Sequence, residues 1–332
     1  MLRVRSVFSW IYRSPVLLLC LASAGWSGNF VVGRLTHATV PPVNLAFFRW
    51  LTATLILLPF AAARLRRDLP VLVQHKGTVL LLAATGVAAY NTLVYEGLQT
   101  TTAISALLMQ SVVPLLILVF VFALFHERPQ LLQLAGLVVS LAGVWVVVTQ
   151  GSPFDTGALA LGGGLGWILL AVISYALYTA LLRRRPSVHP LSLLTVLFGL
   201  GSLMLAPLAA AEAASGRSLP LTAGSVAAVV YVALVPSLLC YFCYNRGAEL
   251  LGAARAGQFL HLMPVFGAVL AFFFLDERIH GYHLVGAALI AAGLAVAAAR
   301  QRRAPVLRPP EEATAQPASR SGEDEPSRAT DR

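Results

Sequence analysis

The sequence is poor in charge. Only 11% of its 332 residues are charged, and Asp and Glu together number 14. The hydrophobic share is 58% and the mean hydropathy is +0.78, far above the values of an ordinary soluble domain. So little charge and so much apolar sequence exclude a soluble globular domain and predict a chain embedded in lipid.

Cysteine is also scarce. Cys20, Cys240 and Cys243 all lie in apolar runs, so neither a disulfide framework nor a secreted context is indicated. Cys240 and Cys243 have C-x-x-C spacing, but redox or zinc chemistry would need a solvent-reachable pair or a second pair of ligands. We therefore expect buried thiols, no metal site and no cofactor.

Enzyme and nucleotide motifs are missing. The sequence contains no G-x-S-x-G, H-E-x-x-H or G-x-x-x-x-G-K-[ST] pattern, and the glycine run 162–164 has no Walker lysine. An enzyme is not predicted, and any transport would draw on an ion or substrate gradient. The net charge of +10 comes mainly from arginines in short loops, without interleaved aromatics on one face, so no nucleic-acid partner is expected either.

What is present is a series of apolar runs, each long enough to cross a hydrocarbon core of about 30 Å as a helix. The expected fold is therefore an all-α membrane protein with ten transmembrane helices. Strands are excluded because open sheet edges cannot lie in lipid. The predicted spans are 16–33, 44–63, 78–96, 103–125, 131–149, 164–182, 191–211, 223–245, 253–275 and 281–299.

The Lys and Arg residues predict the orientation. If residues 1–15 are cytoplasmic, sixteen basic residues fall on the inside and three on the outside, which satisfies the positive-inside rule. Both termini are then cytoplasmic, in a multi-pass protein of the bacterial inner membrane. The basic N-terminus resembles a signal peptide, but no cleavage site follows, so we expect a retained first helix. Residues 304–332 are predicted to be a disordered tail. The inside set is Arg3, Arg5, Arg13, Arg64, Arg66, Arg67, Lys76, Arg128, Arg183, Arg184, Arg185, Arg246, Arg255, Arg300, Arg302 and Arg303; the outside set is Arg34, Arg217 and Arg278.

The sequence also repeats itself at an offset of 150 residues. A mid-helix proline, then Glu-Arg thirteen residues later, then two glycines seven apart, occur in both copies. The matching pairs are Gly97/Gly247, Ala103/Ala253, Ala106/Ala256, Pro114/Pro264, Glu127/Glu277, Arg128/Arg278, Gly136/Gly286 and Gly143/Gly293. Each copy, 16–149 and 164–299, holds five spans, and because five is odd the second must be inverted in the membrane. Inverted repeats are typical of carriers that work by alternating access around a midplane site.

This pattern resembles the EamA branch of the drug/metabolite transporter superfamily across residues 16–299. The likeness is carried by the W-S-G-N-F stretch at Trp26, by Arg49, by the stretch from Tyr90 to Gly97, and by the twin blocks that end at Arg128 and Arg278. Proteins of this kind are secondary carriers, mostly exporters, of amino acids, other small metabolites or drug-like compounds. The resemblance implies a mechanism and leaves the substrate open.

Three kinds of residue are candidates for the function. Pro114 and Pro264 break the fourth and ninth spans, which indicates segments that line a cavity, although an ordinary kink is the alternative. Arg49 lies inside the second span, where it either holds an anionic substrate group or ties helices together. Polar and aromatic side chains at the midpoints of six spans complete the predicted substrate cavity: Trp26, Asn29, Tyr90, Asn91, Tyr95, Gln110, Tyr175, Tyr178, Tyr241, Tyr244, Asn245, Gln258 and His261.

His261 is the candidate for proton coupling, because imidazole titrates near neutrality, although a lone core histidine is the commoner case. Glu127-Arg128 and Glu277-Arg278 are expected to bind neighbouring helices in a structural or gating role. Asp276, Glu277, His280 and His283 lack strong zinc spacing, so a cap or gate is favoured there over a metal site. The glycine-rich fifth and tenth spans are left as packing surfaces or as the interface of a possible homodimer.

The sequence therefore predicts a secondary transporter, with export of amino acids or their analogues as the leading function. Its partners would be a small-molecule substrate, the lipid bilayer and a proton or counter-substrate. Efflux of drugs or toxic compounds is the alternative within transport. A membrane-embedded enzyme or sensor on a ten-helix scaffold is the alternative of a different class.

Overall fold

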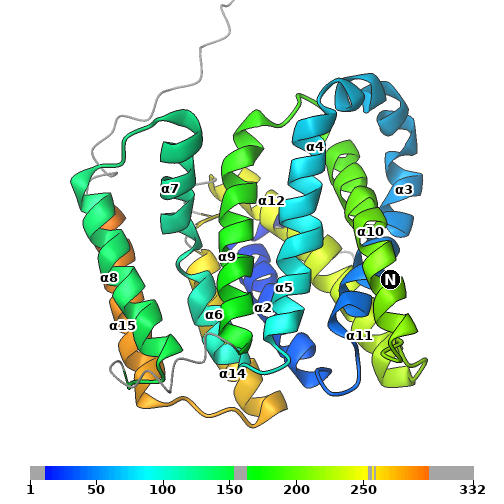
Figure 1. Ribbon diagram of the computed structural model, residues 1–332. Coiled ribbons are helices and arrows are strands. Elements are labelled where there is room, and N and C mark those ends of the chain that lie inside the picture. The colour runs from blue at the N-terminus through cyan, green and yellow to red at the C-terminus, as the bar shows by residue number, and fades with distance from the viewer. Residues whose placement is uncertain (1–11, 153–162, 253–255, 258, 299–332) are drawn as a thin grey trace, which may run out of the picture. The chain divides into compact units, whose positions relative to one another are not determined.

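The computed structural model describes residues 12–152, 163–252, 256–257 and 259–298, and in this part of the chain every regular element is a helix (Figure 1). The predicted tail at 304–332, Gln258 and most of the N-terminal segment lie outside these residues. Each of the ten predicted spans contains described helix, which confirms an all-helical fold.

In the first half, the described residues form eight elements in order. They are α2 (Pro15–Leu35), α3 (Pro42–Gln74), α4 (Lys76–Leu82), the π-helix η1 (Ala83–Ala89), α5 (Tyr90–Gly97), α6 (Ala103–Gln110), α7 (Val113–Phe125) and α8 (Leu131–Val148). The elements α4, η1 and α5 are continuous and make up the third predicted span.

The second half repeats this order. Its elements are α9 (Gly164–Leu181), the 3₁₀ turn η4 (Leu182–Arg184), α10 (Pro190–Ala214), α11 (Ala223–Leu234), the π-helix η5 (Val235–Leu239), α12 (Cys240–Leu251), the 3₁₀ turn η6 (Phe259–Leu262), α14 (Met263–Leu275) and α15 (Gly281–Ala298). Both π-helices thus fall in corresponding spans, the third and the eighth.

The helix starts follow from local chemistry. Proline occupies the first turn of α2, α3 and α10, where its missing N–H would have no intrahelical acceptor. Thr102 and Thr222 cap α6 and α11 by accepting from the amides of Ser105 and Ser225. These residues account for where the five helices start.

By length and apolar composition, seven of the described helical stretches could cross a membrane, and the bent pair α6 and α7 raises this to eight. Phe259–Leu275 and Gly281–Val296 are shorter apolar helices. The fold is therefore that of a multi-pass membrane protein, and the total of ten spans stays a prediction.

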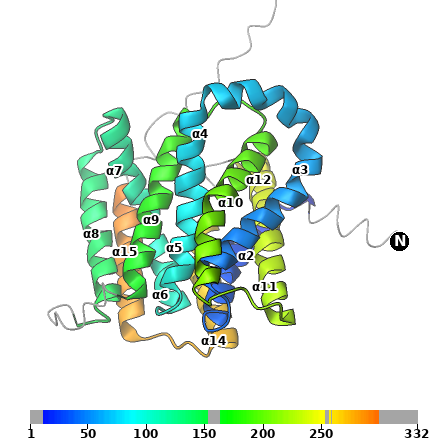
Figure 2. The same ribbon diagram turned by 45° about the vertical axis from the view of Figure 1, so that its right-hand side comes forward.

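The second span is longer than predicted. The second was expected to end at residue 63, but α3 continues to Gln74, with Pro59 and Pro70 inside it, and Figure 2 shows it curving over at that end of the bundle. Interior prolines bend a helix because each removes a hydrogen bond and crowds the preceding turn. The basic residues expected in a loop after residue 63 therefore lie on a curved helix.

The fourth span is broken near its proline, as the sequence predicts. The chain bends by 42° between α6 and α7, and Pro114 lies in the first turn of α7. In the ninth span Pro264 likewise lies in the first turn of α14, directly after the 3₁₀ turn η6. The fourth span thus has α-helix on both sides of its break, whereas in the ninth span a 3₁₀ turn precedes α14.

Helices α8 and α15 pack side by side (Figures 1 and 2). A Cβ added at Gly143 would lie 2.8 Å from the carbonyl oxygen of Gly286, and one added at Gly293 would meet the carbonyl oxygen of Gly136. The two helices are antiparallel, because the later residue of α8 meets the earlier residue of α15. Small residues let the two backbones approach closely, so the packing role expected for these glycines is present.

Other helices also pack against helices from the opposite half of the chain. Helix α2 packs on α12 and α14, while its counterpart α9 packs on α5 and α7, and α3 packs on α10. Where α3 and α10 meet, the carboxylate of Glu212 accepts from the backbone and side-chain nitrogens of Asn44, both at 2.8 Å. The backbone N–H of His189, before α10, donates to Asp68 on α3 at 3.2 Å. Each helix thus supplies an acid to the start of the other.

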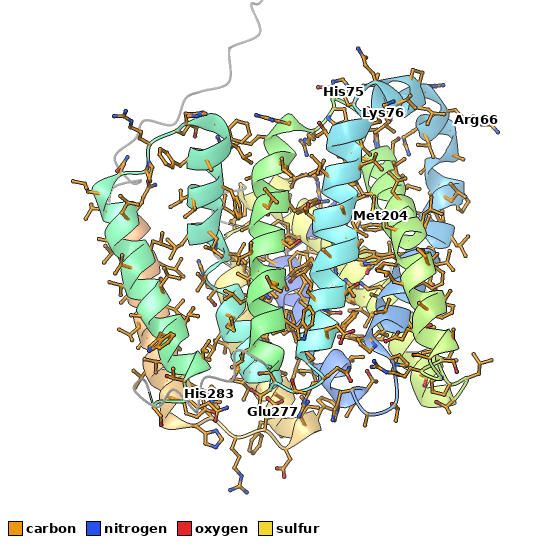
Figure 3. The ribbon with its side chains drawn as sticks, viewed as in Figure 1. Arg66, His75, Lys76, Met204, Glu277 and His283 are labelled. Atoms are coloured by element: carbon orange, nitrogen blue, oxygen red, sulfur yellow. The ribbon has the colours of Figure 1, made fainter. Side chains whose placement is uncertain are left out.

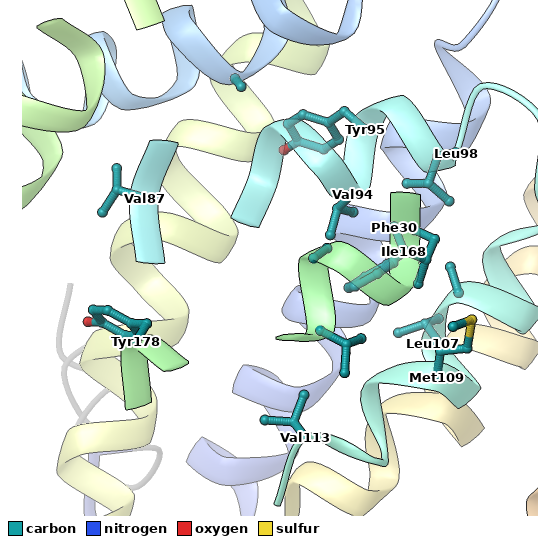
Figure 4. Packing of buried hydrophobic residues seen from close by; sticks show 14 of the residues in the cluster. Phe30, Val87, Val94, Tyr95, Leu98, Leu107, Met109, Val113, Ile168 and Tyr178 are labelled. Carbon is teal, nitrogen blue, oxygen red and sulfur yellow. The ribbon is translucent and has the colours of Figure 1, made fainter. Parts of the chain in front are cut away.

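One large apolar cluster runs through the centre of the bundle. Figure 4 shows part of it, contributed by α2, α5, α6 and α9 among others. A smaller cluster joins Leu18 and Ala22 of α2 to Cys240 and Cys243, which are free, buried thiols. The expectation that this C-x-x-C pair is buried is confirmed. Arg66, His75 and Lys76 mark one end of the bundle, and Glu277 and His283 mark the other (Figure 3).

Candidate functional site

Arg49 on α3 is the centre of a buried polar cluster, and only 3% of the residue is exposed. Its Nη1 donates to Asn29 Oδ1 at 2.7 Å, to Asn91 Oδ1 at 2.8 Å and to the Tyr95 hydroxyl at 2.8 Å. Its Nε donates to the Ser237 hydroxyl at 2.8 Å. One guanidinium therefore joins α3 to α2, α5 and η5.

Every one of these partners is neutral. The ion pairs in the described part of the chain are Arg183–Glu127, Arg217–Glu212 and Arg246–Glu249, and none includes Arg49. The second terminal nitrogen, Nη2, has no acceptor among the described residues. The guanidinium carbon lies 4.5 Å from the centre of the Trp50 ring, which adds a cation–π contact. The cluster thus holds a positive charge that amide, hydroxyl and aromatic groups surround.

Local helix geometry brings the partners together. Asn91 and Tyr95 are four apart on α5 and so share one face. Tyr95 also donates from its hydroxyl to Asn29 Oδ1 at 2.7 Å, which links the partners to one another. Ser237 lies in the π-helix η5 and donates to the carbonyl of Val232, five residues back, at 2.8 Å. The sites where π-turns occur are frequently functional.

Aromatic side chains form two groups near this cluster. In one, the ring centre of Trp26 lies 5.7 Å from that of Tyr241 and 5.4 Å from that of Tyr244. The indole N–H of Trp26 donates to the carbonyl of Pro236 at 2.9 Å, which fixes this group to η5, beside Ser237. These faces are apolar, with polar edges that can accept or donate hydrogen bonds.

The second aromatic group comes from α5 and α9. The ring centres of Tyr90 and Tyr175 lie 4.6 Å apart, and those of Tyr175 and Tyr178 lie 5.6 Å apart. The Tyr90 hydroxyl donates to Gln110 Oε1 at 3.2 Å, while Gln110 Nε2 is buried without an acceptor among the described residues. The indole nitrogen Nε1 of Trp50 is also buried, and it too has no acceptor among the described residues. Two donors near the cluster are therefore unused.

The structure thus brings most of the predicted cavity residues into contact with one another, and it separates a few. Asn245, Pro114 and His261 are exposed and make none of the bonds described above, and Pro264 is half-buried. His261 lies in the 3₁₀ turn η6, not in the α-helix expected there, so the three-residue spacing from position 258 does not define an α-helical face. Its role in proton coupling stays a prediction.

The broken ninth span is held by serines that the sequence reasoning did not single out. Ser23 and Ser27, one turn apart on α2, donate to the carbonyls of Phe259 and Met263, both at 2.8 Å. Chain breaks inside a membrane are tolerated where other protein groups bind the freed carbonyls. The two hydroxyls therefore bind the first residue of η6 and the first residue of α14.

The twin Glu-Arg motifs have different partners at the two ends of the bundle. Glu277 accepts from the backbone N–H groups of Ala103 at 2.9 Å and Ile104 at 3.1 Å, at the start of α6. A carboxylate is favourable there because the helix start carries partial positive charge and free N–H groups. Glu127 instead forms an exposed ion pair with Arg183, with a nitrogen–oxygen distance of 2.7 Å.

Beside Glu277, His283 forms a buried hydrogen bond with the Ser105 hydroxyl at 3.1 Å and accepts from the backbone of His280 at 3.1 Å. These contacts cap α6 and α15, which is the structural role favoured for this group over metal binding. The arginines of the twin motifs, Arg128 and Arg278, are exposed. Whether the motifs also act as gates stays a prediction.

Two clefts lie away from Arg49. One, of about 570 Å³, lies beside Glu277 and is lined by Arg34, His37, Thr102 and the end of α14. The other, of about 550 Å³, lies between α7 and α8 with Arg128 at its edge. Neither includes Arg49, which is almost fully buried in this conformation. The central cavity expected from the sequence therefore stays a prediction.

Ser237 is the member of the cluster that the sequence reasoning missed. A serine in an apolar helix is a weak signal, and the π-turn that aims it at Arg49 has no recognisable sequence motif. The partners that were predicted, Asn29, Asn91 and Tyr95, have larger polar groups that stand out among apolar neighbours.

Comparison with known proteins agrees with this architecture. The model of the EamA-like transporter family matches residues 13–149 and 162–299. The uncharacterized transporter YetK of Bacillus subtilis is 27% identical over 86% of this chain and 87% of its own length. A probable terminal-alkyne amino-acid exporter of Streptantibioticus cattleyicolor is 27% identical over 88% of this chain and 90% of its own length.

A solved crystal structure matches with a TM-score of 0.57 and 21% identity, covering 87% of this chain and 98% of that one, which supports the fold alone. The family model covers two stretches that together leave out only the chain ends and a short linker. With its multiple apolar helices and its matches to bacterial transporters, the chain belongs to the EamA-like transporter family, in the drug/metabolite transporter superfamily.

Proposed function

We propose that this protein is a secondary transporter that exports a small metabolite bearing a carboxylate, with Arg49 as the group that binds the carboxylate. The transporter would consist of ten spans in two inverted five-helix repeats and work by alternating access. The 150-residue repeat, the antiparallel packing of α8 on α15 and the matching positions of η1 and η5 support this architecture. The excess of basic residues on one side supports cytoplasmic termini in the bacterial inner membrane.

The observation that carries the proposal is the uncompensated charge of Arg49. A guanidinium at membrane depth costs about 2.5–3.5 kcal/mol on insertion scales, and such residues commonly mark substrate or ion pathways. Here Nη1 and Nε are satisfied by neutral acceptors, whereas Nη2 has none among the described residues. A substrate carboxylate would supply both the missing acceptor and the missing negative charge.

The competing role is a purely structural tie, which the bonds to α2, α5 and η5 would also suit. Asn91→Asp distinguishes the two roles because it is nearly isosteric. The new carboxylate still accepts from Nη1, so a tie is preserved or strengthened, but it neutralises the guanidinium and competes with an anionic substrate. A tie predicts unchanged transport, and a binding site predicts lost transport.

The experiment measures exchange of radiolabelled carboxylates across vesicles that contain the purified protein. We expect Asn91→Asp to lower exchange at least tenfold without lowering the midpoint of thermal unfolding. Arg49→Gln should lower both. Gln74→Glu, an amide-to-acid change at the exposed end of α3, and Arg67→Gln, on an exposed part of α3, are the matched controls and should leave both near the original values.

If the Asn91→Asp variant stayed stable and its vesicles still exchanged carboxylates at the normal rate, the carboxylate site would be overturned. Arg49 would then have only the structural role of joining helices. The name of one relative, a probable terminal-alkyne amino-acid exporter, supports a metabolite of about amino-acid size. If no compound crossed the vesicles while a lipid or headgroup was turned over, a membrane enzyme would replace the transporter.

A second candidate within transport is efflux of amphipathic aromatic compounds. The two aromatic groups, around Trp26 and around Tyr175, favour it because they offer wide apolar faces. Such efflux would not depend on a carboxylate. Exchange of cationic or neutral aromatic compounds that survives Asn91→Asp would support this alternative.

A further inference from the structure

We infer that the substrate is a carboxylic acid without a free ammonium group, such as a 2-hydroxy acid or an N-acylated amino acid with an aromatic or aliphatic body. This inference rests on the proposed carboxylate site at Arg49 and narrows its substrate class. It narrows the sequence expectation, which put amino acids and their analogues first.

The first argument is the placement of acids. Every acidic residue in the described part of the chain lies in the last two turns of a helix or directly after a helix, and none bonds to Arg49 or to its partners. Five of them, all but Glu96 and Asp276, accept hydrogen bonds from groups elsewhere. The full set of acids is Asp68, Glu96, Glu127, Glu212, Glu249, Asp276 and Glu277.

A free amino acid bound through its carboxylate would bring its ammonium group close to the guanidinium of Arg49. Two like charges in a medium of low dielectric constant repel strongly, and no acid in the cluster offsets the repulsion. A hydroxyl or an acylated nitrogen at the same carbon carries no charge. The neutral substituent is therefore favoured.

The second argument is the balance of donors and acceptors. Arg49 already uses the side-chain oxygens of Asn29, Asn91, Tyr95 and Ser237, and Asn29 Oδ1 accepts a second bond from Tyr95. An ammonium group has three donors and no acceptor, so it would compete for oxygens that are occupied.

Near the cluster, the buried side-chain atoms without a partner among the described residues are both donors, Trp50 Nε1 and Gln110 Nε2. Arg49 Nη2 is a third donor that bonds to no described acceptor. Buried donors gain most from a ligand rich in acceptors, because leaving them unpaired is costly. A carboxylate with a neighbouring hydroxyl or amide carbonyl offers such acceptors.

The aromatic groups suggest what the rest of the substrate is like. Trp26 with Tyr241 and Tyr244, and Tyr90 with Tyr175 and Tyr178, present ring faces that pack well on apolar bodies. Ring faces also attract methylated ammonium groups. A trimethylated amino acid is therefore the compound most able to contradict the inference, and the experiment includes it.

The experiment compares compounds that share one phenylpropanoate body. Vesicles containing the full protein are tested for exchange with 3-phenyllactate, N-acetylphenylalanine, phenylalanine and trimethylated phenylalanine. We expect the first two to reach half-maximal exchange at concentrations at least tenfold below the last two. In Asn91→Asp the order should shift toward phenylalanine, because the new acid provides a partner for its ammonium group.

Phenylalanine or its trimethylated form exchanging as well as phenyllactate, with Arg49 still required, would overturn this inference and leave the carboxylate site intact. If the order of substrates were the same in Arg49→Gln, in Asn91→Asp and in the original protein, the carboxylate site itself would be overturned. Gln74→Glu, the amide-to-acid control at the end of α3, should keep the original order of substrates.

Discussion

The Ser140 hydroxyl donates to the carbonyl oxygen of Ile290 at 3.2 Å, and the two residues are 150 positions apart, which is the spacing of the sequence repeat. A helix therefore packs against its own counterpart so that equivalent positions meet. Two antiparallel helices in this relation are related by an approximate two-fold axis near the bond. An axis of this kind in the membrane plane is what an inverted repeat requires.

Gly143 tests this close packing. A Cβ there would lie 2.8 Å from the carbonyl oxygen of Gly286 and 3.0 Å from the backbone nitrogen of Ile290, so Gly143→Ala forces α8 and α15 apart. We expect a loss of about 1–3 kcal/mol in stability, the usual cost of overpacking. The measurement is thermal unfolding of the purified protein in detergent.

The matched control is Gly77→Ala, since nothing lies within 4 Å of a Cβ at that helical glycine. It should be neutral or stabilise the protein by about 0.5–1 kcal/mol, because alanine suits a helix better than glycine. Equal unfolding temperatures for the two variants would mean that α8 and α15 do not touch at Gly143.

Ser237→Ala should destabilise the protein by about 1–3 kcal/mol, because it leaves Arg49 Nε, a buried charged donor, without an acceptor. Ser192→Ala is the control. The Ser192 hydroxyl is also buried but has no partner among the described residues, so its removal should be neutral or mildly stabilising. Unfolding temperatures that fall equally in both variants would argue against the bond to Arg49.

Glu277→Gln should loosen the start of α6. The amide side chain keeps one acceptor oxygen but loses the charge that favours a helix N-terminus, an effect of about 0.3–2 kcal/mol. We expect faster hydrogen exchange at the amides of Ala103 and Ile104, the two donors to Glu277. Glu127→Gln breaks only an exposed ion pair and should leave exchange in α6 unchanged. Unaltered exchange in Glu277→Gln would contradict the contact.

Single cysteines test the proposed topology. Placed at positions 66 and 184, they should react with an impermeant thiol reagent from the same side of the membrane, whereas cysteines at 127 and 277 should react from opposite sides. The native Cys240 and Cys243 are buried and should label slowly, but Cys20 is half-buried, so all three are replaced by alanine in the background protein. Labelling of 127 and 277 from one side would rule out the inverted repeat.

Much of the helical architecture can be predicted because hydropathy determines where lipid-spanning helices lie. The break at Pro114 can also be predicted from the sequence, since proline removes a backbone donor wherever it occurs. The length of α3 cannot be predicted in this way. Its continuation past residue 63 runs through arginines that a hydropathy profile assigns to a loop, although nothing in their chemistry ends a helix.

The candidate site could be predicted in part. Asn29, Asn91 and Tyr95 stand out as polar residues in apolar spans, but that all three bind Arg49 depends on how α2, α3 and α5 are arranged. Which helices touch is decided by packing between distant segments, and hydropathy carries little of that information. His261 is exposed, and hydropathy alone does not tell whether a polar residue in an apolar run faces a cavity or another surface, so its place at the cavity stays a prediction.

The π-helices η1 and η5 have a consequence for motion. A π-turn holds one residue more than an α-turn, and each α-helical residue turns the chain by about 100°. If η1 relaxed to an α-helix, α5 would swivel about its own axis and carry Asn91 and Tyr95 away from Arg49. The hydrogen bonds from Arg49 to Asn91 and Tyr95 would then break, although every helix would keep its place in the bundle.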